Sequence, residues 1–305
     1  MLWRCRDRGF DLRDRPIVMG IVNVTPDSFS DGGRYLEPAA AIAHGRRLVA
    51  EGAAIVDLGA ESTRPGAAPV PAEEQLRRLL PVLDALAADG ACVSVDTASP
   101  AVARQALSAG ASIVNDVTAL GDPEMARVVA EGGAGVVLMH MRGTPRTMQS
   151  DPRYEDAARE VADWLAARLE SARREGVAPE RIALDPGIGF GKTPRHNFEL
   201  LARLPEIAAL GRPVVVGVSR KSFLGKREAA GVRPGAAGGA AAPEPLPDLP
   251  PDQRLEGGLA ATAVAVFLGA RIVRTHDVAA TVRAVGIAES LRAARRPHME
   301  TRDPV

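Results

Sequence analysis

Met19-Gly-Ile-Val-Asn-Val-Thr-Pro-Asp-Ser-Phe-Ser-Asp-Gly-Gly33 is the stretch of sequence that indicates the fold. Residues 17 to 24 form an apolar run with one polar residue, Asn23, near its end, and a segment of Pro, Asp, Ser and Gly follows. This pattern predicts a buried strand that presents an amide to a loop. Because the catalytic groups of a parallel α/β protein lie at the carboxyl ends of its strands, Asn23 is a candidate site residue. The alternative is that Asn23 only ends the strand.

Further apolar runs rich in Val and Ile repeat this pattern, and longer segments of helical period separate them. Near-continuous apolar strands, each followed by a helix, imply a parallel sheet buried on both faces. Eight such units are the number that closes a (β/α)8 TIM barrel, which we predict as a single α/β domain over residues 17–294. A doubly wound open sheet is the alternative, disfavoured because no Gly-x-Gly-x-x-Gly follows the first strand. Strands are expected at 17–24, 54–59, 92–96, 113–117, 135–139, 182–185, 213–218 and 271–274.

Three segments depart from this rhythm. Residues 1–16 form a charged N-terminal extension. Residues 226–253 are rich in Pro, Ala and Gly, and this composition cannot bury enough surface to offset its ordering entropy. We therefore predict a flexible insertion between the seventh strand and its helix, and a disordered tail over 295–305.

The composition narrows the class of protein. Lys plus Arg and Asp plus Glu both number 38, so no overall field attracts nucleic acid or an anionic membrane. The first sixteen residues lack an apolar core for a secretory signal, and the longest apolar run, around residues 257–270, is too short to span a bilayer. A soluble, cytoplasmic protein is expected. The two cysteines, Cys5 and Cys92, give neither a disulfide framework nor a metal-ligand spacing, and Cys92 is expected to pack in the core.

Polar side chains stand at the end of every predicted strand. One Asp at a strand end is often a helix cap. Such groups at all eight ends are hard to ascribe to capping, and closure of the barrel would bring them to a single mouth. The residues at these ends are Asn23, Glu61 to Gly66, Asp96-Thr97, Asn115-Asp116, Met139-His140-Met141, Asp185 to Lys192, Ser219 to Ser222 and Arg274 to Asp277.

The short acceptors and donors suit a flat heterocycle. Asp96, Asn115, Asp185 and Lys221 are expected near the barrel axis. A carboxylate can accept two parallel hydrogen bonds from an amino-pyrimidine edge, so this set fits a ring with several N–H groups.

The cations suit an anion. Arg64, Arg274 and His276 are expected on the rim, where they could bind a phosphate or pyrophosphate, although a surface ion pair is the alternative for either arginine. Asn23 could supply an oxygen to Mg²⁺, a hard cation that usually keeps several waters.

Two segments rich in Pro, Gly and Ser, residues 25–33 and 62–69, are interpreted as loops that move. Each contains one apolar residue, Phe29 or Pro65, that could close over a bound ring. The alternative is a pair of loose surface turns.

The motifs of this sequence resemble those of the dihydropteroate synthase family. They are the opening stretch from Met19 together with Glu-Ser-Thr-Arg-Pro-Gly, Ser-Val-Asp-Thr, Asn-Asp-Val, Leu-Met-His-Met, Leu-Asp-Pro-Gly-Ile-Gly-Phe-Gly-Lys, Val-Ser-Arg-Lys-Ser and Arg-Thr-His-Asp, over about residues 17 to 290. The resemblance implies a (β/α)8 barrel, usually a homodimer, that joins 6-hydroxymethyl-7,8-dihydropterin diphosphate to 4-aminobenzoate and releases pyrophosphate with Mg²⁺ present. The chain departs from the family in its long insertion and in Thr275, where Val is more common.

The resemblance also implies roles for single residues. The pterin would lie against Asp96, Asn115, Asp185 and Lys221, of which Asp96, Asp185 and Lys221 would be catalytic. The diphosphate would meet Thr63, Arg64, Arg274 and His276, with Mg²⁺ at Asn23. The aminobenzoate would lie between Phe29 and Pro65 with its carboxylate at Ser222, which is expected to open the helix after the seventh strand, where free N–H groups favour an anion.

The family mechanism is dissociative: the bond to pyrophosphate breaks before the amine attacks. Two competing interpretations remain. A corrinoid-linked pterin methyltransferase would share the ring contacts but would not need Arg64, Arg274 and His276 as an anion site. A non-catalytic paralogue would bind a pterin or a partner without turnover.

Overall fold

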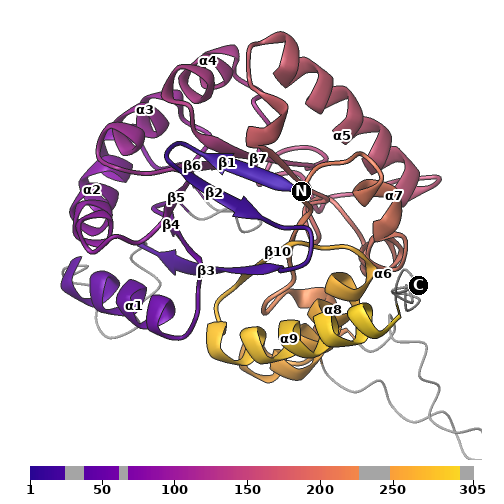
Figure 1. The fold of residues 1–305 in the computed structure, drawn as a ribbon. Helices are drawn as coiled ribbons and strands as arrows, with labels where there is room; N and C mark the ends of the chain where they lie inside the picture. Colours follow the sequence, from indigo (N-terminus) through magenta and orange to yellow (C-terminus); the bar gives the residue numbers. More distant parts are fainter. Residues whose placement is uncertain (25–37, 62–67, 227–247, 296–305) are drawn as a thin grey trace, which may run out of the picture.

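The computed structural model describes residues 1–24, 38–61, 68–226 and 248–295. Eight parallel strands stand at the centre and helices surround them (Figure 1). The predicted (β/α)8 barrel is therefore confirmed, and each expected strand is present with bounds that shift by at most two residues. The strands are β3 (Ile17–Asn23), β4 (Ile55–Gly59), β5 (Val93–Asp96), β6 (Ile113–Asp116), β7 (Gly135–Met139), β8 (Ile182–Asp185), β9 (Val215–Gly217) and β10 (Ile272–Thr275).

The strand order closes the sheet. Neighbours follow the order β8-β7-β6-β5-β4-β3-β10-β9, and all of these pairs are parallel. The two edges meet through a parallel bridge between Leu184 and Val214, and the Leu184 N–H donates to the Pro213 carbonyl at 2.8 Å. All strand carboxyl ends consequently open at one mouth.

The helices cover the outside of the sheet, and several begin at side-chain caps. Ser99, Asp122, Asp156 and Thr193 each accept a hydrogen bond from a backbone N–H in the first turn of the helix that follows. The helices are α1 (Pro38–Ala50), α2 (Ala72–Ala88), α3 (Pro100–Ser108), α4 (Pro123–Gly132), α5 (Ala157–Arg174), α6 (Pro194–Ala202), α7 (Leu204–Ala208), α8 (Leu255–Leu268) and α9 (Val278–Ala294), with 3-10 turns η2 (Pro179–Arg181), η3 (Ser222–Gly225) and η5 (Pro251–Gln253).

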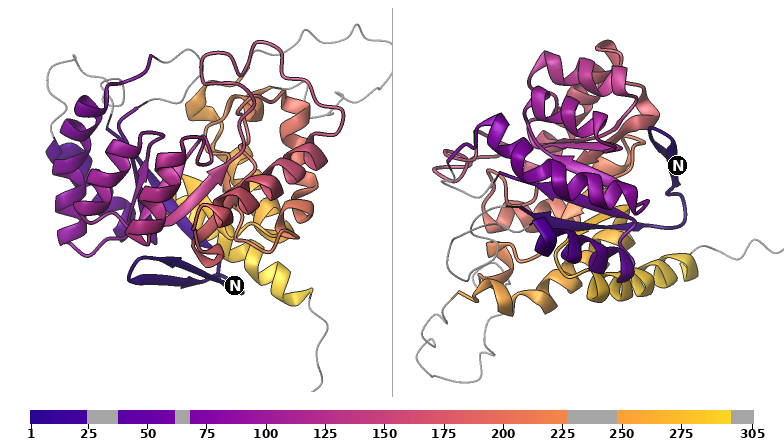
Figure 2. Two further views of the ribbon diagram at one scale, coloured as in Figure 1. Left: turned by 90° about the horizontal axis from the view of Figure 1, so that it is seen from above. Right: turned by 90° about the vertical axis from the view of Figure 1, so that its left-hand side faces the viewer.

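The N-terminal extension forms a hairpin that the sequence did not predict. Strands β1 (Leu2–Cys5) and β2 (Arg8–Asp11) pair antiparallel and lie across one end of the barrel (Figure 2). The Trp3 indole donates to the Arg181 carbonyl at 2.9 Å and the Arg6 N–H donates to the Gly133 carbonyl at 2.9 Å, just before β8 and β7 begin. The hairpin therefore covers the amino ends of the strands, opposite the mouth.

Side chains along each strand point alternately into the barrel and out toward the helices. Near the amino ends of the strands, the barrel interior is an apolar layer that the hairpin covers. Cys92, a free cysteine, is buried in this layer, as predicted. Two residues further along the same faces, five of the strands carry a polar side chain: Asp57, Ser94, Asn115, Asp185 and Arg274. The hairpin and the apolar layer therefore support the site from the amino ends of the strands. The buried members of the layer are Trp3, Cys5, Leu12, Met19, Ile55, Cys92, Ile113, Val137, Ala183, Val215 and Ile272.

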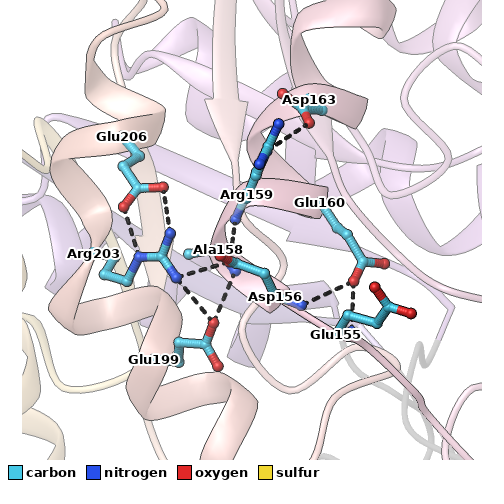
Figure 3. A network of polar contacts seen from close by, with 9 residues as sticks. All are labelled: Glu155, Asp156, Ala158, Arg159, Glu160, Asp163, Glu199, Arg203 and Glu206. Atoms are coloured by element: carbon cyan, nitrogen blue, oxygen red, sulfur yellow. Dashed lines mark hydrogen bonds and ion pairs between the residues drawn. The ribbon is translucent and has the colours of Figure 1, made fainter.

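A polar network on the outside joins α5 to α6 and α7 (Figure 3). The Arg203 guanidinium donates to Asp156 at 2.8 Å, to Glu199 at 3.3 Å and to both carboxylate oxygens of Glu206 at 2.6 and 2.9 Å. Asp156 also caps α5, so Arg203 links the first turn of that helix to the junction of the next two.

The predicted insertion lies mostly outside the described residues, as does nearly all of the predicted tail. At its far end the chain is hydrogen bonded: the Leu249 N–H donates to the Gly225 carbonyl at 3.2 Å, and the Leu249 carbonyl accepts from Arg254 at 2.8 Å. Within the described part of the chain, none of the helices has the length and apolar character that crossing a bilayer requires.

Candidate active site

A pocket opens at the carboxyl ends of the strands. It contains about 470 Å³ of empty space, part of which is open to solvent. The predicted ring-binding residues Asp96, Asn115, Asp185 and Lys221 all line it, and Arg274 and His276 join them. The other lining residues are Ile21, Val117, Met139, Phe190, Gly217 and Ser219.

Three charges meet on one side of this pocket. The Arg274 guanidinium donates from Nη2 to Asp96 at 2.7 Å and from Nε to Asp57 at 2.6 Å. The sequence placed Arg274 on the rim, apart from the inward carboxylates, and that separation is wrong. Arg274 belongs to the interior face of β10, because it is the second residue after Ile272 of the apolar layer.

Burial and neighbouring charges change the ionisation of this group of residues. Burial raises the pKa of Asp96 to about 7; Arg274 opposes this rise and Asp57 adds to it. Burial also works against the charge of Arg274, but the carboxylates of Asp57 and Asp96 outweigh it and raise its pKa. Asp96 is thus a carboxylate of the pocket whose charge changes near neutral pH.

Asn115 lies beside Asp96 on the neighbouring strand and is almost fully buried. Its side-chain amide donates to Asp57 at 3.1 Å, which leaves its carbonyl oxygen as the acceptor that a ligand could reach.

Asp185 and Lys221 occupy the opposite side of the pocket. Asp185 ends β8, and its carboxylate accepts the Gly187 N–H at 2.7 Å. Burial raises the pKa of Asp185, against the effect of Lys221. Burial lowers the pKa of Lys221 to about 8, against the attraction of Asp185. Lys221 donates to the Ile188 carbonyl, and its ammonium lies 4.7 Å from the centre of the Phe190 ring.

The loop after β8 has a support that the sequence did not reveal. Buried Lys192 donates to the carbonyls of Gly187 at 3.0 Å and Phe190 at 2.9 Å, and lies 2.9 Å from Nδ1 of His140. Burial lowers the pKa of both groups, that of His140 to about 3, so the imidazole is neutral and Nδ1 is within hydrogen-bond distance of Lys192 Nζ. Lys192 thereby holds the loop that carries Phe190.

The loops after β9 and β10 are joined at the mouth. The Ser219 hydroxyl lies 3.1 Å from His276 Nδ1. Next to it, Arg220 donates to the two oxygens of Asp277 at 2.6 and 3.2 Å. Arg220 has a left-handed backbone with φ of 60°, which is uncommon for a residue with a side chain and turns the chain between Ser219 and Lys221. Both of those residues consequently face the pocket.

Asn23 ends β3, and Gly59 separates it from Asp96 in the sheet. A Cβ atom at Gly59 would lie 3.8 Å from Asn23 Oδ1 and 3.9 Å from Asp96 Oδ2, so the glycine leaves space between the two side chains. In the described ranges, no group of three or more His, Cys, Asp and Glu side chains could hold a metal ion.

One local prediction is wrong. Ser222 does not open the long helix after the seventh strand. It begins η3, a 3-10 turn of four residues, and α8 starts only at Leu255. A turn of four residues has no long-helix dipole, so the effect that was expected to favour an anion at Ser222 is missing from residues 222–225.

Four predicted site residues lie outside the described residues: Phe29, Thr63, Arg64 and Pro65. The flanking Glu61 is described, and its carboxylate accepts the Val70 N–H at 3.0 Å and the Gln75 amide at 3.3 Å. These bonds hold Glu61 beside Val70 and the first turn of α2.

Sequence reasoning missed Asp57. This carboxylate is 0% exposed, lies in the middle of β4 and contacts two residues of the pocket. A charged residue within an otherwise apolar strand is itself a signal, because an isolated buried charge is too costly without a partner. Asp57 does not stand at a strand end, so the pattern of polar strand ends does not reveal it.

Comparison with known proteins identifies the class of enzyme to which the chain belongs. The family described as "Pterin binding enzyme" matches residues 19–276, so the fold and the pocket together define a pterin-binding barrel enzyme. Dihydropteroate synthase of Escherichia coli (strain K12) is 42% identical over 281 residues, which cover 92% of this chain and 93% of that protein. The chain belongs to the dihydropteroate synthase family.

Solved structures agree. Xanthomonas albilineans dihydropteroate synthase with 4-aminobenzoic acid superimposes with a TM-score of 0.83 at 45% identity, over 96% of this chain and 98% of that one. The same enzyme in complex with 7,8-dihydropteroate gives a TM-score of 0.81 at 42% identity, over 96% and 99% of the two chains.

Proposed function

We propose that this barrel is a transferase that joins 6-hydroxymethyl-7,8-dihydropterin diphosphate to 4-aminobenzoate, giving 7,8-dihydropteroate and pyrophosphate. The observation that carries the proposal is the convergence of Asp96, Asn115, Asp185 and Lys221 on one pocket. Family membership supports it, as do relatives whose structures hold 4-aminobenzoic acid and 7,8-dihydropteroate.

The ring site supplies acceptors and donors in the pattern that a pterin needs. The carboxylates of Asp96 and Asp185 accept ring and amino N–H groups, the Asn115 carbonyl oxygen accepts another, and Lys221 donates to a ring oxygen or nitrogen. As the bond to the diphosphate breaks, the two carboxylates also stabilise positive charge spread into the pterin.

The leaving group meets the cations. Arg274 and His276 are the described candidates for the diphosphate, and Thr63 and Arg64 are proposed to complete the anion site. Mg²⁺ fits a site with one neutral amide oxygen, Asn23, because this ion usually keeps several waters and takes further ligands from substrate phosphates. When bound there, Mg²⁺ would neutralise charge developing on the departing pyrophosphate.

The second substrate is proposed to lie nearer the mouth, between Phe29 and Pro65, with its carboxylate at Ser222. The arylamine attacks the exocyclic carbon after the carbon–oxygen bond breaks, the pyrophosphate leaves with the bonding electrons, and the nitrogen releases one proton to solvent. An arylamine is already neutral at pH 7, so no strong general base is required, and His276 is assigned to phosphate binding.

A homodimer in the cytoplasm is proposed as the working state. Exposed apolar side chains on the last two helices support an interface: Val264 on α8 is 51% exposed, and Ile287 and Leu291 on α9 are 65% and 60% exposed. Ile287 and Leu291 stand four residues apart, so they share one face of α9.

A coupled assay of pyrophosphate release tests the function. Purified protein with both substrates and Mg²⁺ is expected to release pyrophosphate, and leaving out 4-aminobenzoate should abolish formation of dihydropteroate. Asp185→Ala should abolish pterin binding in calorimetry. Absence of dihydropteroate when both substrates and Mg²⁺ are present, or wild-type pterin affinity in Asp185→Ala, would contradict the proposal.

A further inference from the structure

Asp57 lies behind the pocket and does not line it. It is 0% exposed, whereas the Asp96 side chain retains 11% exposure and does line the pocket. Asp57 therefore reaches a bound ligand only through its neighbours.

Those neighbours are two residues of the pocket. A single oxygen of Asp57, Oδ2, accepts from Arg274 Nε at 2.6 Å and from Asn115 Nδ2 at 3.1 Å, while Oδ1 has no hydrogen-bond partner among the described residues. The single atom Oδ2 of Asp57 therefore connects Asn115 of the ring site to Arg274 of the proposed anion site.

Arg274 pairs with two carboxylates, Asp96 and Asp57, and only Asp96 is accessible to a bound ligand. A pterin that donates its N–H groups to Asp96 competes with Arg274 for that carboxylate. The Arg274 side chain is only 22% exposed, and a mostly buried guanidinium without a counter-ion would be destabilising. Asp57 cannot be reached by the ligand, so it keeps Arg274 paired when Asp96 turns to the ring.

We propose that Asp57 is a positioning residue: it holds Arg274 and Asn115 from beneath the pocket, so that Asp96 can exchange Arg274 for the substrate ring. The inference rests on the proposed function for the nature of the ligand. The coupling between Asp57 and Arg274 rests on the geometry alone.

Asp57→Asn is the informative substitution. The amide oxygen keeps an acceptor of the same size for Arg274 and Asn115, but the negative charge is lost. Ser94→Ala is the matched control, because Ser94 faces Asp57 in the register of the neighbouring strand, is equally buried, and has no hydrogen-bond partner for its hydroxyl among the described residues.

Calorimetry with 6-hydroxymethylpterin, which lacks the diphosphate, measures the effect on the ring site. Asp57→Asn is expected to weaken binding by about tenfold or more, the size of one charge-assisted hydrogen bond, and Ser94→Ala to leave it unchanged. In an Arg274→Met background, Asp57→Asn should weaken binding clearly less than in the wild type, because only the part of its effect that acts through Asn115 remains. Equal losses in both backgrounds would overturn the inference.

Thermal unfolding without ligand gives a second readout. Asp57→Asn should lower the Tm of the wild type but raise that of Arg274→Met, where Asp57 is a buried charge without its partner. A purely structural role in β4 would lower Tm in both backgrounds, which would overturn the inference. If the wild type does not bind the pterin, the proposed function fails with the ligand part of the inference, and the change of sign in Tm still identifies the Asp57–Arg274 coupling.

Discussion

Lowering the pH from 7 to 5 should weaken pterin binding, chiefly because Asp96 becomes protonated. In the ligand-free pocket its pKa is raised to about 7, mainly by burial. The carboxylate is the form that accepts pterin N–H groups, so affinity is present above this pKa and is lost as the pH falls through it. Lys221, whose pKa is lowered only to about 8, keeps its proton throughout this window.

The magnitude follows from the ionised fraction. Asp96 is half ionised at pH 7 and about 1% ionised at pH 5, so the association constant should fall roughly 50-fold, or about 2 kcal/mol. Calorimetric titration with 6-hydroxymethylpterin measures this without interference from phosphate ionisation. Asp96→Asn serves as the control, since its weaker binding should lack the same dependence. Equal affinity of the wild type at pH 5 and pH 7 would refute the reasoning.

Three further outcomes are expected. Trp3→Ala, which removes a fully buried side chain and its bond to the Arg181 carbonyl, should lower the free energy of unfolding in urea by about 3–5 kcal/mol; a loss below 1 kcal/mol would contradict a packed hairpin. Lys192→Met should reduce kcat/KM about tenfold or more while the protein stays folded by circular dichroism, because the loop that carries Phe190 loses two hydrogen bonds; wild-type kinetics would count against this support. Deleting residues 232–245, which spares the Leu249 contacts, should leave kcat/KM unchanged, and a tenfold loss would mean that the insertion reaches the site.

The barrel was predictable because eight apolar runs of strand length each end in polar residues. Closure then follows from the number of strands, and it brings Asp96, Asn115, Asp185 and Lys221 to one pocket, as predicted. These positions were accessible to sequence reasoning because each stands at the point where an apolar run ends.

Two features of the site depend on which face of a strand points inward, and the polar residues at the strand ends do not by themselves reveal that face. Asp57 and Arg274 lie on interior faces two residues beyond Ile55 and Ile272 of the apolar layer, so they meet across β3 inside the barrel. The position of Arg274 in the chain suggests a cation at the rim, but its position in the sheet places it inside the barrel.

The hairpin escaped prediction for a different reason. Its strands have only four residues each and contain several charges, and their alternation of buried and exposed residues becomes visible only against the barrel end that they cover. Trp3 and Cys5, both fully buried, make sense only once the interior layer above them is known.

The central claim is that the inward polar residues at the carboxyl ends of the strands form one pterin site. A crystal structure of the complex with 6-hydroxymethylpterin tests it most directly. The account predicts the ring between Asp96, Asn115, Asp185 and Lys221, with Arg274 still paired with Asp57. A ring bound elsewhere on the barrel, with these four side chains free of it, would contradict the account.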